Sequence, residues 1–221
     1  MKNGVSRHPS ERAVLSILEK GLAELELETH PGAADQLCAL VLLLHEWGTR
    51  INLTGHREPE AMATRLVLDA AALSAALPEI LDTRSMVDLG SGAGFPGLPI
   101  AILFPAVEVR LVESRKKRHH FQRAVRRELG LANVRPLLGR AESLASEPGD
   151  LVVAQAMTQP FEALTLMGRW ARPGGLAVLP ASEAALPPDP PQGFGALELR
   201  EYRVPISATH RKMWLSRRLV A

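Results

Sequence analysis

The stretch VDLGSGAGFPGLPIAILFP, residues 87–105, holds four glycines and three prolines between apolar ends. Its apolar beginning, from residue 85, predicts a short buried strand, and the glycines that follow predict a tight turn. Such a turn lies at the carboxyl end of a strand, which is where open α/β sheets bind ligands. Glycine has no Cβ, so a ligand can rest directly against the main chain there. Taken alone, the turn is weak evidence for a ligand, because a purely structural turn has the same pattern.

Strand and helix patterns alternate through the chain after residue 85. A proline-rich loop at 186–195 precedes the last of the expected strands. Because strands that alternate with helices pair in parallel, the sequence predicts an α/β fold with a mostly parallel sheet and helices on both faces. The expected strands are 85–89, 107–114, 151–157, 176–181 and 211–220, and the expected helices are 97–104, 115–130 and 161–171.

The first eighty residues are helical in pattern throughout. Ser10 is a suitable N-cap for a first helix, which ends before the His-Pro-Gly run at 30–32. Apolar residues at helical spacing predict a second helix over 37–47 and a third over 59–77. We therefore expect an N-terminal helical extension, residues 1–80, packed on a core formed by residues 81–221.

Two carboxylates flank the glycine turn. Glu113 ends the next strand, where nucleotide-binding sheets keep an acid for the ribose hydroxyls; the alternative is a solvated strand end that faces the arginines after it. Asp88 would meet the amino-acid end of a ligand or cap the amides of the turn itself. The spacing of Gly90, Gly92 and Gly94 differs from the G-x-G-x-x-G of dinucleotide sites, so it favours a ligand without a diphosphate, such as S-adenosylmethionine.

Composition and charge exclude several classes of protein. Although 46% of the 221 residues are hydrophobic, no apolar run approaches the ~18 residues of a membrane span, and the N-terminus has no apolar signal segment. Cys38 is the only cysteine, which excludes an intramolecular disulfide and fits a reducing cytoplasm. The net charge of +2 makes no case for a nucleic-acid partner, so any such case requires a local patch.

A patch of that kind begins directly after Glu113. On the predicted helix, Phe121 and Val125 turn inward and leave most of the cations outside. We predict that these cations bind the phosphates of RNA, with a merely solvated helix face as the alternative. His119 and His120 are expected at the surface, and no metal site is expected. The predicted RNA-binding residues are Arg115, Lys116, Lys117, Arg118, Arg123, Arg126 and Arg127.

Several motifs together resemble one family. The segment VDLGSGAGFPGLPIAI is similar to the first motif of the ribosomal RNA small subunit methyltransferase G family, also called the glucose-inhibited division protein B family. The likeness continues in the same order over roughly residues 35–180, through INLTGHREPEAM, ESRKKRHHFQRAVRRELGLANVRPLLGRAE and RWARPGGLAVL. It implies a class I S-adenosylmethionine-dependent methyltransferase fold, which is Rossmann-like with a mostly parallel seven-stranded sheet. It also implies methylation of N7 of a guanine in 16S rRNA.

The resemblance extends to the cofactor and the partners. It implies S-adenosyl-L-methionine as cofactor and 16S rRNA or the small ribosomal subunit as partner, and we expect a cytoplasmic monomer with no membrane contact. Family contacts to the cofactor fall on Gly90, Phe95 and the pair Ala141-Glu142, the last two beside the adenine. With the residues of the turn, the predicted cofactor-binding set is Asp88, Gly90, Ser91, Gly92, Gly94, Phe95, Glu113, Ala141, Glu142 and Gln155.

The implied chemistry needs no general base. Guanine N7 is an acceptor in the major groove with an exposed lone pair and no proton to lose, so the task of the enzyme is alignment of the reacting atoms. The run AQAMTQP, 154–160, would line the base pocket through Gln155, Thr158 and Gln159, although the last two also suit ordinary helix capping.

Three positions depart from the family pattern. The chain has Ala-Gln-Ala at 154–156 where Ser-Arg-Ala is usual, Leu-Pro-Ala at 179–181 where a Lys-Gly pair is frequent, and Leu66 in place of a histidine. They keep open a catalytically impaired homologue that still binds RNA or the ribosome, and a methyltransferase of a different substrate, such as a small molecule. A nicotinamide dehydrogenase is disfavoured by the glycine spacing.

Overall fold

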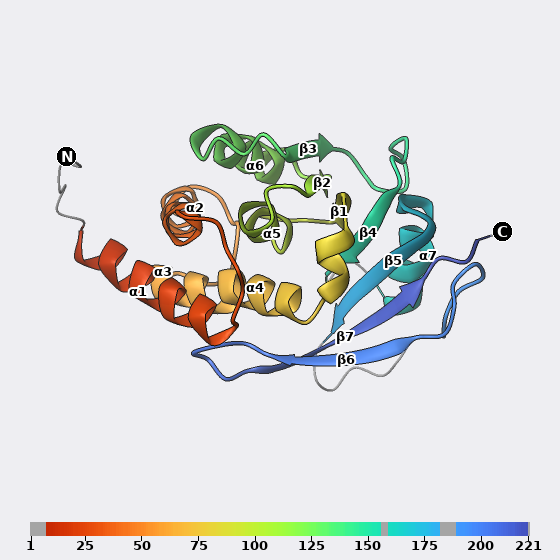
Figure 1. Cartoon of the computed structure of the whole chain (residues 1–221). Coiled ribbons are helices and arrows are strands. Elements are labelled where there is room, and N and C mark those ends of the chain that lie inside the picture. The colour runs from red at the N-terminus through yellow and green to blue at the C-terminus, as the bar shows by residue number, and fades with distance from the viewer. Residues whose placement is uncertain (1–7, 156–158, 182–188, 221) are drawn as a thin grey trace.

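A computed structural model describes residues 8–155, 159–181 and 189–220, and within them seven strands form one sheet in the order β3-β2-β1-β4-β5-β7-β6 (Figure 1). Strands β1 to β5 pair in parallel, β7 is antiparallel to β5, and β6 is antiparallel to β7. The expected mostly parallel sheet is confirmed. The strands are β1 Ser85–Leu89, β2 Glu108–Glu113, β3 Val134–Leu138, β4 Gly149–Ala154, β5 Ala171–Ala181, β6 Glu198–Arg203 and β7 His210–Arg217.

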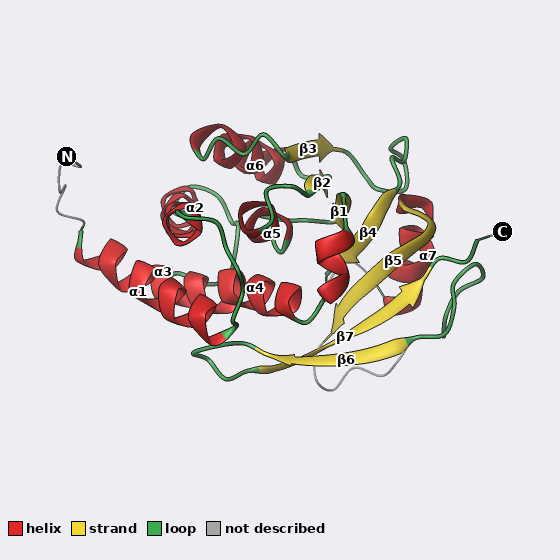
Figure 2. Cartoon of the chain, viewed as in Figure 1, coloured by secondary structure: helices red, strands yellow, loops and turns green. Residues whose placement is uncertain are grey.

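Helices cover both faces of this sheet (Figure 2). Alternate residues of β1 face opposite sides: Met86 joins a hydrophobic cluster with α5 and α6, whereas Val87 joins a second cluster with α7. Burial on both faces explains why the central strands are continuous apolar runs in the sequence. These helices are α5 Gly97–Leu103, α6 Lys116–Glu128 and α7 Pro160–Trp170.

The N-terminal helices lie on the same face of the sheet as α5. The expected third helix is present, and its middle turn is the five-residue π-helix η1. Among the described residues, no helix has the length and apolar character needed to span a bilayer. The elements are α1 Pro9–Glu24, α2 Ala33–Gly48, α3 Pro59–Met62, η1 Ala63–Val67, α4 Leu68–Ala75 and the 3₁₀ helix η2 Pro78–Asp82.

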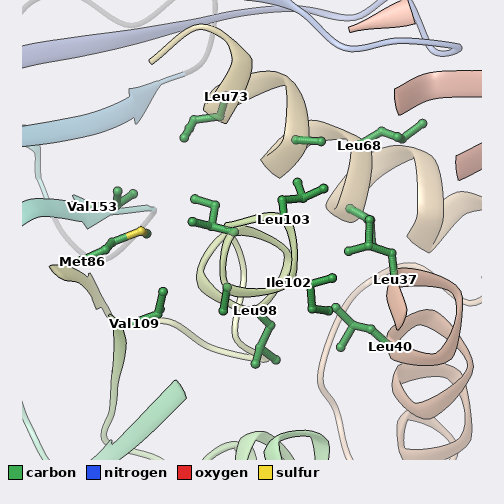
Figure 3. Close-up of a cluster of buried hydrophobic side chains, with 14 of the residues drawn as sticks. Leu37, Leu40, Leu68, Leu73, Met86, Leu98, Ile102, Leu103, Val109 and Val153 are labelled. Carbon is green, nitrogen blue, oxygen red and sulfur yellow. The ribbon is translucent and has the colours of Figure 1, made fainter. Parts of the chain in front are cut away.

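Helix α5 is the centre of the larger hydrophobic cluster. All seven of its residues are buried, because the sheet contacts one side and α2 and α4 contact the other (Figure 3). Leu98, Ile102 and Leu103 belong to the same cluster as Leu37 of α2 and Leu68 of α4. A helix that is apolar all round is stable only when it is surrounded in this way. The first turn of α5, which follows the glycine turn, is therefore fixed by packing from both sides.

Apolar patterning predicts neither β3 nor β6. β3 contains a proline and its burial is mixed, so its sequence has no continuous apolar run. β6 is an edge strand with mostly exposed residues. Its sequence therefore has no apolar pattern that would predict a strand. The expectation that the proline-rich loop leads into the last strand is corrected, because β6 intervenes before β7. Residues 182–188, which include the first part of that loop, lie outside the described chain.

Candidate cofactor site and basic helix

The glycine turn joins β1 to α5 and takes three positive φ angles, 65° at Gly90, 59° at Gly92 and 90° at Gly94. At Gly94 a Cβ would overlap the side chain of Leu98, so packing as well as conformation requires glycine. At Gly92 the nearest atom to a Cβ would be a nitrogen of Arg118 at 3.8 Å. Only the end of the Arg118 side chain and the Gly90 carbonyl oxygen lie within ordinary contact distance of that position, so the outer face of Gly92 is otherwise open.

Glu113 connects this turn to the end of β2. Its side chain is buried, its Oε2 accepts a hydrogen bond from the Gly92 N–H at 2.9 Å, and its Oε1 accepts one from the Arg115 N–H at 2.6 Å. The solvated strand end that we kept as an alternative is not what the fold forms. Each carboxylate oxygen can accept a further hydrogen bond. The carboxylate thus lies beside the open glycine, and its role toward a ribose stays a prediction.

The two carboxylate oxygens of Asp88 differ in their hydrogen bonding. It is 1% exposed, its Oδ2 accepts a hydrogen bond from the Gly97 N–H at 2.9 Å, and its Oδ1 has no partner among the described residues. Burial raises the pKa of this carboxyl to about 7, with the charge of Glu113 raising it further and the Gly97 amide opposing the rise. One oxygen therefore caps the loop and the other is buried without a partner, so the role of Asp88 toward a ligand stays a prediction.

Gln122 holds the turn in place from α6, a role that we did not predict from the sequence. Its buried Nε2 donates hydrogen bonds to the Ser91 Oγ at 2.9 Å and to the Gly92 carbonyl at 2.8 Å. The Ser91 N–H in turn donates to the carbonyl of Val112 in β2. The only indication in the sequence is that this amide side chain directly follows Phe121, which was expected to face inward.

The loops after β3 and β4 meet the same edge of the sheet. The Gly139 N–H donates to the Glu113 carbonyl at 3.0 Å, which brings the segment after β3 against the end of β2. In that segment Ala141 is buried, its carbonyl accepts from the Trp170 indole, and Glu142 is exposed. Gln155, which follows β4, is exposed and lines a small hollow with Phe95. Of the other residues predicted to line the base pocket, Thr158 lies outside the described residues and Gln159 is the exposed N-cap residue of α7.

Asp69, a buried carboxylate on α4, lines the same hollow as Phe95 and Gln155. The Tyr202 hydroxyl donates to the Asp69 Oδ1 at 3.2 Å, and the Arg211 guanidinium lies 3.1 Å from the Oδ2. Burial raises the pKa of Asp69 even though the charge of Arg211 opposes this. In the sequence, Asp69 stands out as a carboxylate within an otherwise apolar helix stripe. No sequence pattern indicates its partners Tyr202 and Arg211.

Helix α6 starts at the Glu113 loop and carries the predicted cations. Six of the seven have exposed side chains, and Arg118 is intermediate. His120 is exposed as expected, but His119 is buried, because its position on α6 faces β3; burial lowers its pKa. In the part of the chain that the structure describes, no group of three or more His, Cys, Asp and Glu side chains could hold a metal ion.

The strand order, the turn after β1 and the acid that ends β2 define a class I methyltransferase fold. The structure of the putative methyltransferase yhhF from Escherichia coli matches 70% of this chain and 87% of its own, with a TM-score of 0.55 and 18% identity. The structure of M. jannaschii TYW2 in complex with AdoMet matches 67% of this chain and 76% of its own, with a TM-score of 0.52 and 14% identity. Both likenesses concern the fold.

The chain belongs to the rRNA small subunit methyltransferase G family, whose model matches residues 33–183. The ribosomal RNA small subunit methyltransferase G of Chromohalobacter salexigens is 40% identical over 211 residues, which cover 91% of this chain and 96% of that protein. The resemblance drawn from the motifs is confirmed. The protein is an rRNA methyltransferase of this family, with S-adenosylmethionine as its methyl donor.

Proposed function

We propose that the protein methylates N7 of a guanine in the 16S rRNA of the small ribosomal subunit. The observation that carries the proposal is the open face of Gly92 beside the buried Glu113, at the sheet edge from which the basic helix α6 begins. This edge includes the ends of β1 and β4, where the strand order reverses and open α/β sheets bind their ligands.

The residues at this edge fit the cofactor. S-adenosylmethionine, when bound, supplies a methyl group that is already activated on a sulfonium sulfur. Glu113 would accept hydrogen bonds from the ribose hydroxyls, and the unpartnered Oδ1 of Asp88 would face the amino-acid end directly or through water. Ala141 and Glu142 would lie beside the adenine. Gly92 would let the main chain approach the ligand.

The reaction then needs positioning more than proton transfer. N7 of guanine attacks with its lone pair and loses no proton, so no side chain has to act as a base. Alignment of reactants can supply roughly 7–11 kcal/mol of barrier reduction. Gln155 and Phe95, which line one hollow at this edge, would shape the place of the target base. The exposed cations of α6 would hold the phosphates of the RNA.

The activity is tested with labelled S-adenosylmethionine and small-subunit rRNA from a strain that lacks this gene. We expect N7-methylguanosine in the nuclease digest, identified by mass spectrometry, from either the deproteinised RNA or the assembled subunit. If the protein binds the cofactor and RNA but forms no methylated nucleoside, it is the binding homologue instead. A different methylated nucleoside would contradict the N7 assignment alone.

The cofactor site is tested by two substitutions. Glu113→Gln removes the charge that would accept the ribose hydroxyls, and Gly92→Val covers the open main chain, so we expect each to weaken S-adenosylmethionine binding at least tenfold in calorimetry, at ~1.4 kcal/mol per tenfold change. Glu19→Gln, an exposed carboxylate on α1, is the matched control and should leave the affinity unchanged. Wild-type affinity in both site variants would contradict the proposal that the cofactor binds at this edge of the sheet.

A further inference from the structure

A basic cleft of about 690 Å³ lies between α2 and α6, where no cofactor contact is expected. One wall is formed by α6, which contributes His120, Arg123, Arg126 and Arg127, and the other includes Trp47, next to the last residue of α2. The volume is in the range of small-molecule sites and is sufficient for a nucleotide. The cleft therefore combines an aromatic ring with several cations in one concave surface.

The charges in this cleft are largely uncompensated. Arg127 forms an ion pair with Glu128 at 2.7 Å, but neither Arg123 nor Arg126 has an ion-pair or hydrogen-bond partner for its side chain in the described part of the chain. Both side chains are exposed. Two unpaired guanidinium groups on one helix face favour an anionic ligand, and arginine suits phosphate by its planar set of donors.

Trp47 indicates that the ligand is more than a phosphate. Its ring is partly buried and is held by an edge contact with Phe121 of α6, with ring centroids 5.7 Å apart. A phosphate alone would gain nothing from an indole, whereas proteins that bind single-stranded RNA stack bases on aromatic rings and hold the backbone with cations. The combination favours an unpaired nucleotide over a protein or a free anion.

The cleft shares no lining residue with the hollow beside Phe95 and Gln155, where we propose that the target base lies. None of its lining residues belongs to the predicted cofactor-binding set either. A nucleotide bound in the cleft would therefore be one that flanks the target along the RNA.

We propose that this cleft binds one unpaired nucleotide of the substrate RNA, with its base against Trp47 and its phosphates on Arg123 and Arg126. This rests on the proposed function, because the flanking nucleotide belongs to the same RNA. The site would place the RNA strand along α6 so that the target guanine reaches the sheet edge.

The test measures the affinity of a short labelled oligouridylate by fluorescence anisotropy over a range of salt concentrations. We expect Trp47→Leu to weaken binding at least fivefold and Trp47→Phe less than twofold, because phenylalanine keeps a stacking ring. Arg126→Gln should weaken binding and lower the slope of log K against log salt by about one. Arg12→Gln, an exposed arginine on α1 outside the cleft, is the matched control and should match wild type.

Further measurements separate this inference from the proposed function. In Trp47→Leu and Arg126→Gln, KM for RNA should rise while S-adenosylmethionine affinity matches wild type, and circular dichroism reports whether Trp47→Leu still folds. Wild-type affinity in both Trp47→Leu and Arg126→Gln would overturn the site, and a loss confined to the arginine variant would overturn nucleotide binding. If wild type binds the oligonucleotide but methylates no small-subunit RNA, the proposed function fails and the cleft stands.

Discussion

Asp88 carries a carboxyl group that the fold almost removes from solvent. Its position between β1 and the first turn of α5 is fixed by the Gly97 amide, and burial is the largest cause of its raised pKa. A cationic ligand near the unpartnered Oδ1 would favour the ionised form and release a proton on binding. The burial of this one carboxyl group thus makes the stability of the fold depend on pH.

The first prediction concerns Asp88→Asn and pH. Folding raises the pKa of Asp88 from 3.8 to about 7, so between about pH 4 and 7 the folded state binds more protons than the unfolded state. The contribution of this group to the free energy of unfolding is therefore largest below about pH 4 and falls as pH rises toward 7. The asparagine variant lacks this dependence and should be more stable than wild type at pH 8, by at most about 4 kcal/mol.

Urea denaturation at a series of pH values measures this difference. Asp150→Asn is the contrasting variant: although burial opposes it, hydrogen bonds from the Ser85 and Arg84 amides and the charge of Arg172 lower the Asp150 pKa. Asp150 therefore stabilises the fold above about pH 4 and loses this effect as pH falls. Its variant should be less stable than wild type at neutral pH. A slope between pH 4 and 7 that is the same in wild type and Asp88→Asn would contradict the assignment.

At the scale of elements, two groups join the β6–β7 hairpin to the N-terminal helices. Asp69 of α4 contacts Tyr202 of β6 and Arg211 of β7, and Arg200 of β6 forms an ion pair with Glu79 of η2 at 2.9 Å. These contacts hold an exposed edge strand that has little apolar surface of its own. They also fix one wall of the hollow beside Phe95.

The second prediction is that Tyr202→Phe destabilises the protein by about 1–3 kcal/mol, because the buried Asp69 loses a hydroxyl donor that nothing replaces. Urea unfolding of Tyr202→Phe, Asp69→Asn and the double variant gives the interaction energy. We expect a coupling above about 0.5 kcal/mol, as for residues in one hydrogen-bond network. Additive effects would mean that the two side chains act independently.

At the scale of the molecule, the N-terminal helices and the sheet share one hydrophobic cluster. Leu18 of α1, Leu37 of α2 and Leu68 of α4 belong to the same cluster as Val109 and Val153 of the sheet. Removing either part would expose buried apolar surface on the other, at roughly 25 cal/mol per Å². The division into a helical extension, residues 1–80, and a core, residues 81–221, stays a prediction. Because the two parts share one hydrophobic cluster, we expect them to unfold together.

The third prediction is a single cooperative unfolding transition. Single-tryptophan variants provide two local probes, since Trp47 lies in α2 and Trp170 at the end of α7 against the sheet. Their fluorescence transitions in urea should coincide with each other and with circular dichroism. Two separate midpoints would show instead that the helical extension is an independent unit.

Short-range patterns account for what could be predicted. The turn at Gly90, Gly92 and Gly94 needs positive φ angles that only glycine adopts readily, so it is visible in the sequence. The cations of α6 are visible because they are contiguous. Gln122, Asp69 and Tyr202 could not be assigned in the same way, because their partners are 30 or more positions away in the chain.

The sequence by itself determined the alternation of strands and helices, the glycine turn, the acid at Glu113 and the basic helix, because each depends on neighbouring residues. Only the tertiary structure decided that Glu113 binds the turn, that one oxygen of Asp88 is unpartnered, and that Trp47 meets the cations of α6 across a cleft. These depend on distant segments coming together, and burial and charge at a site follow from that packing.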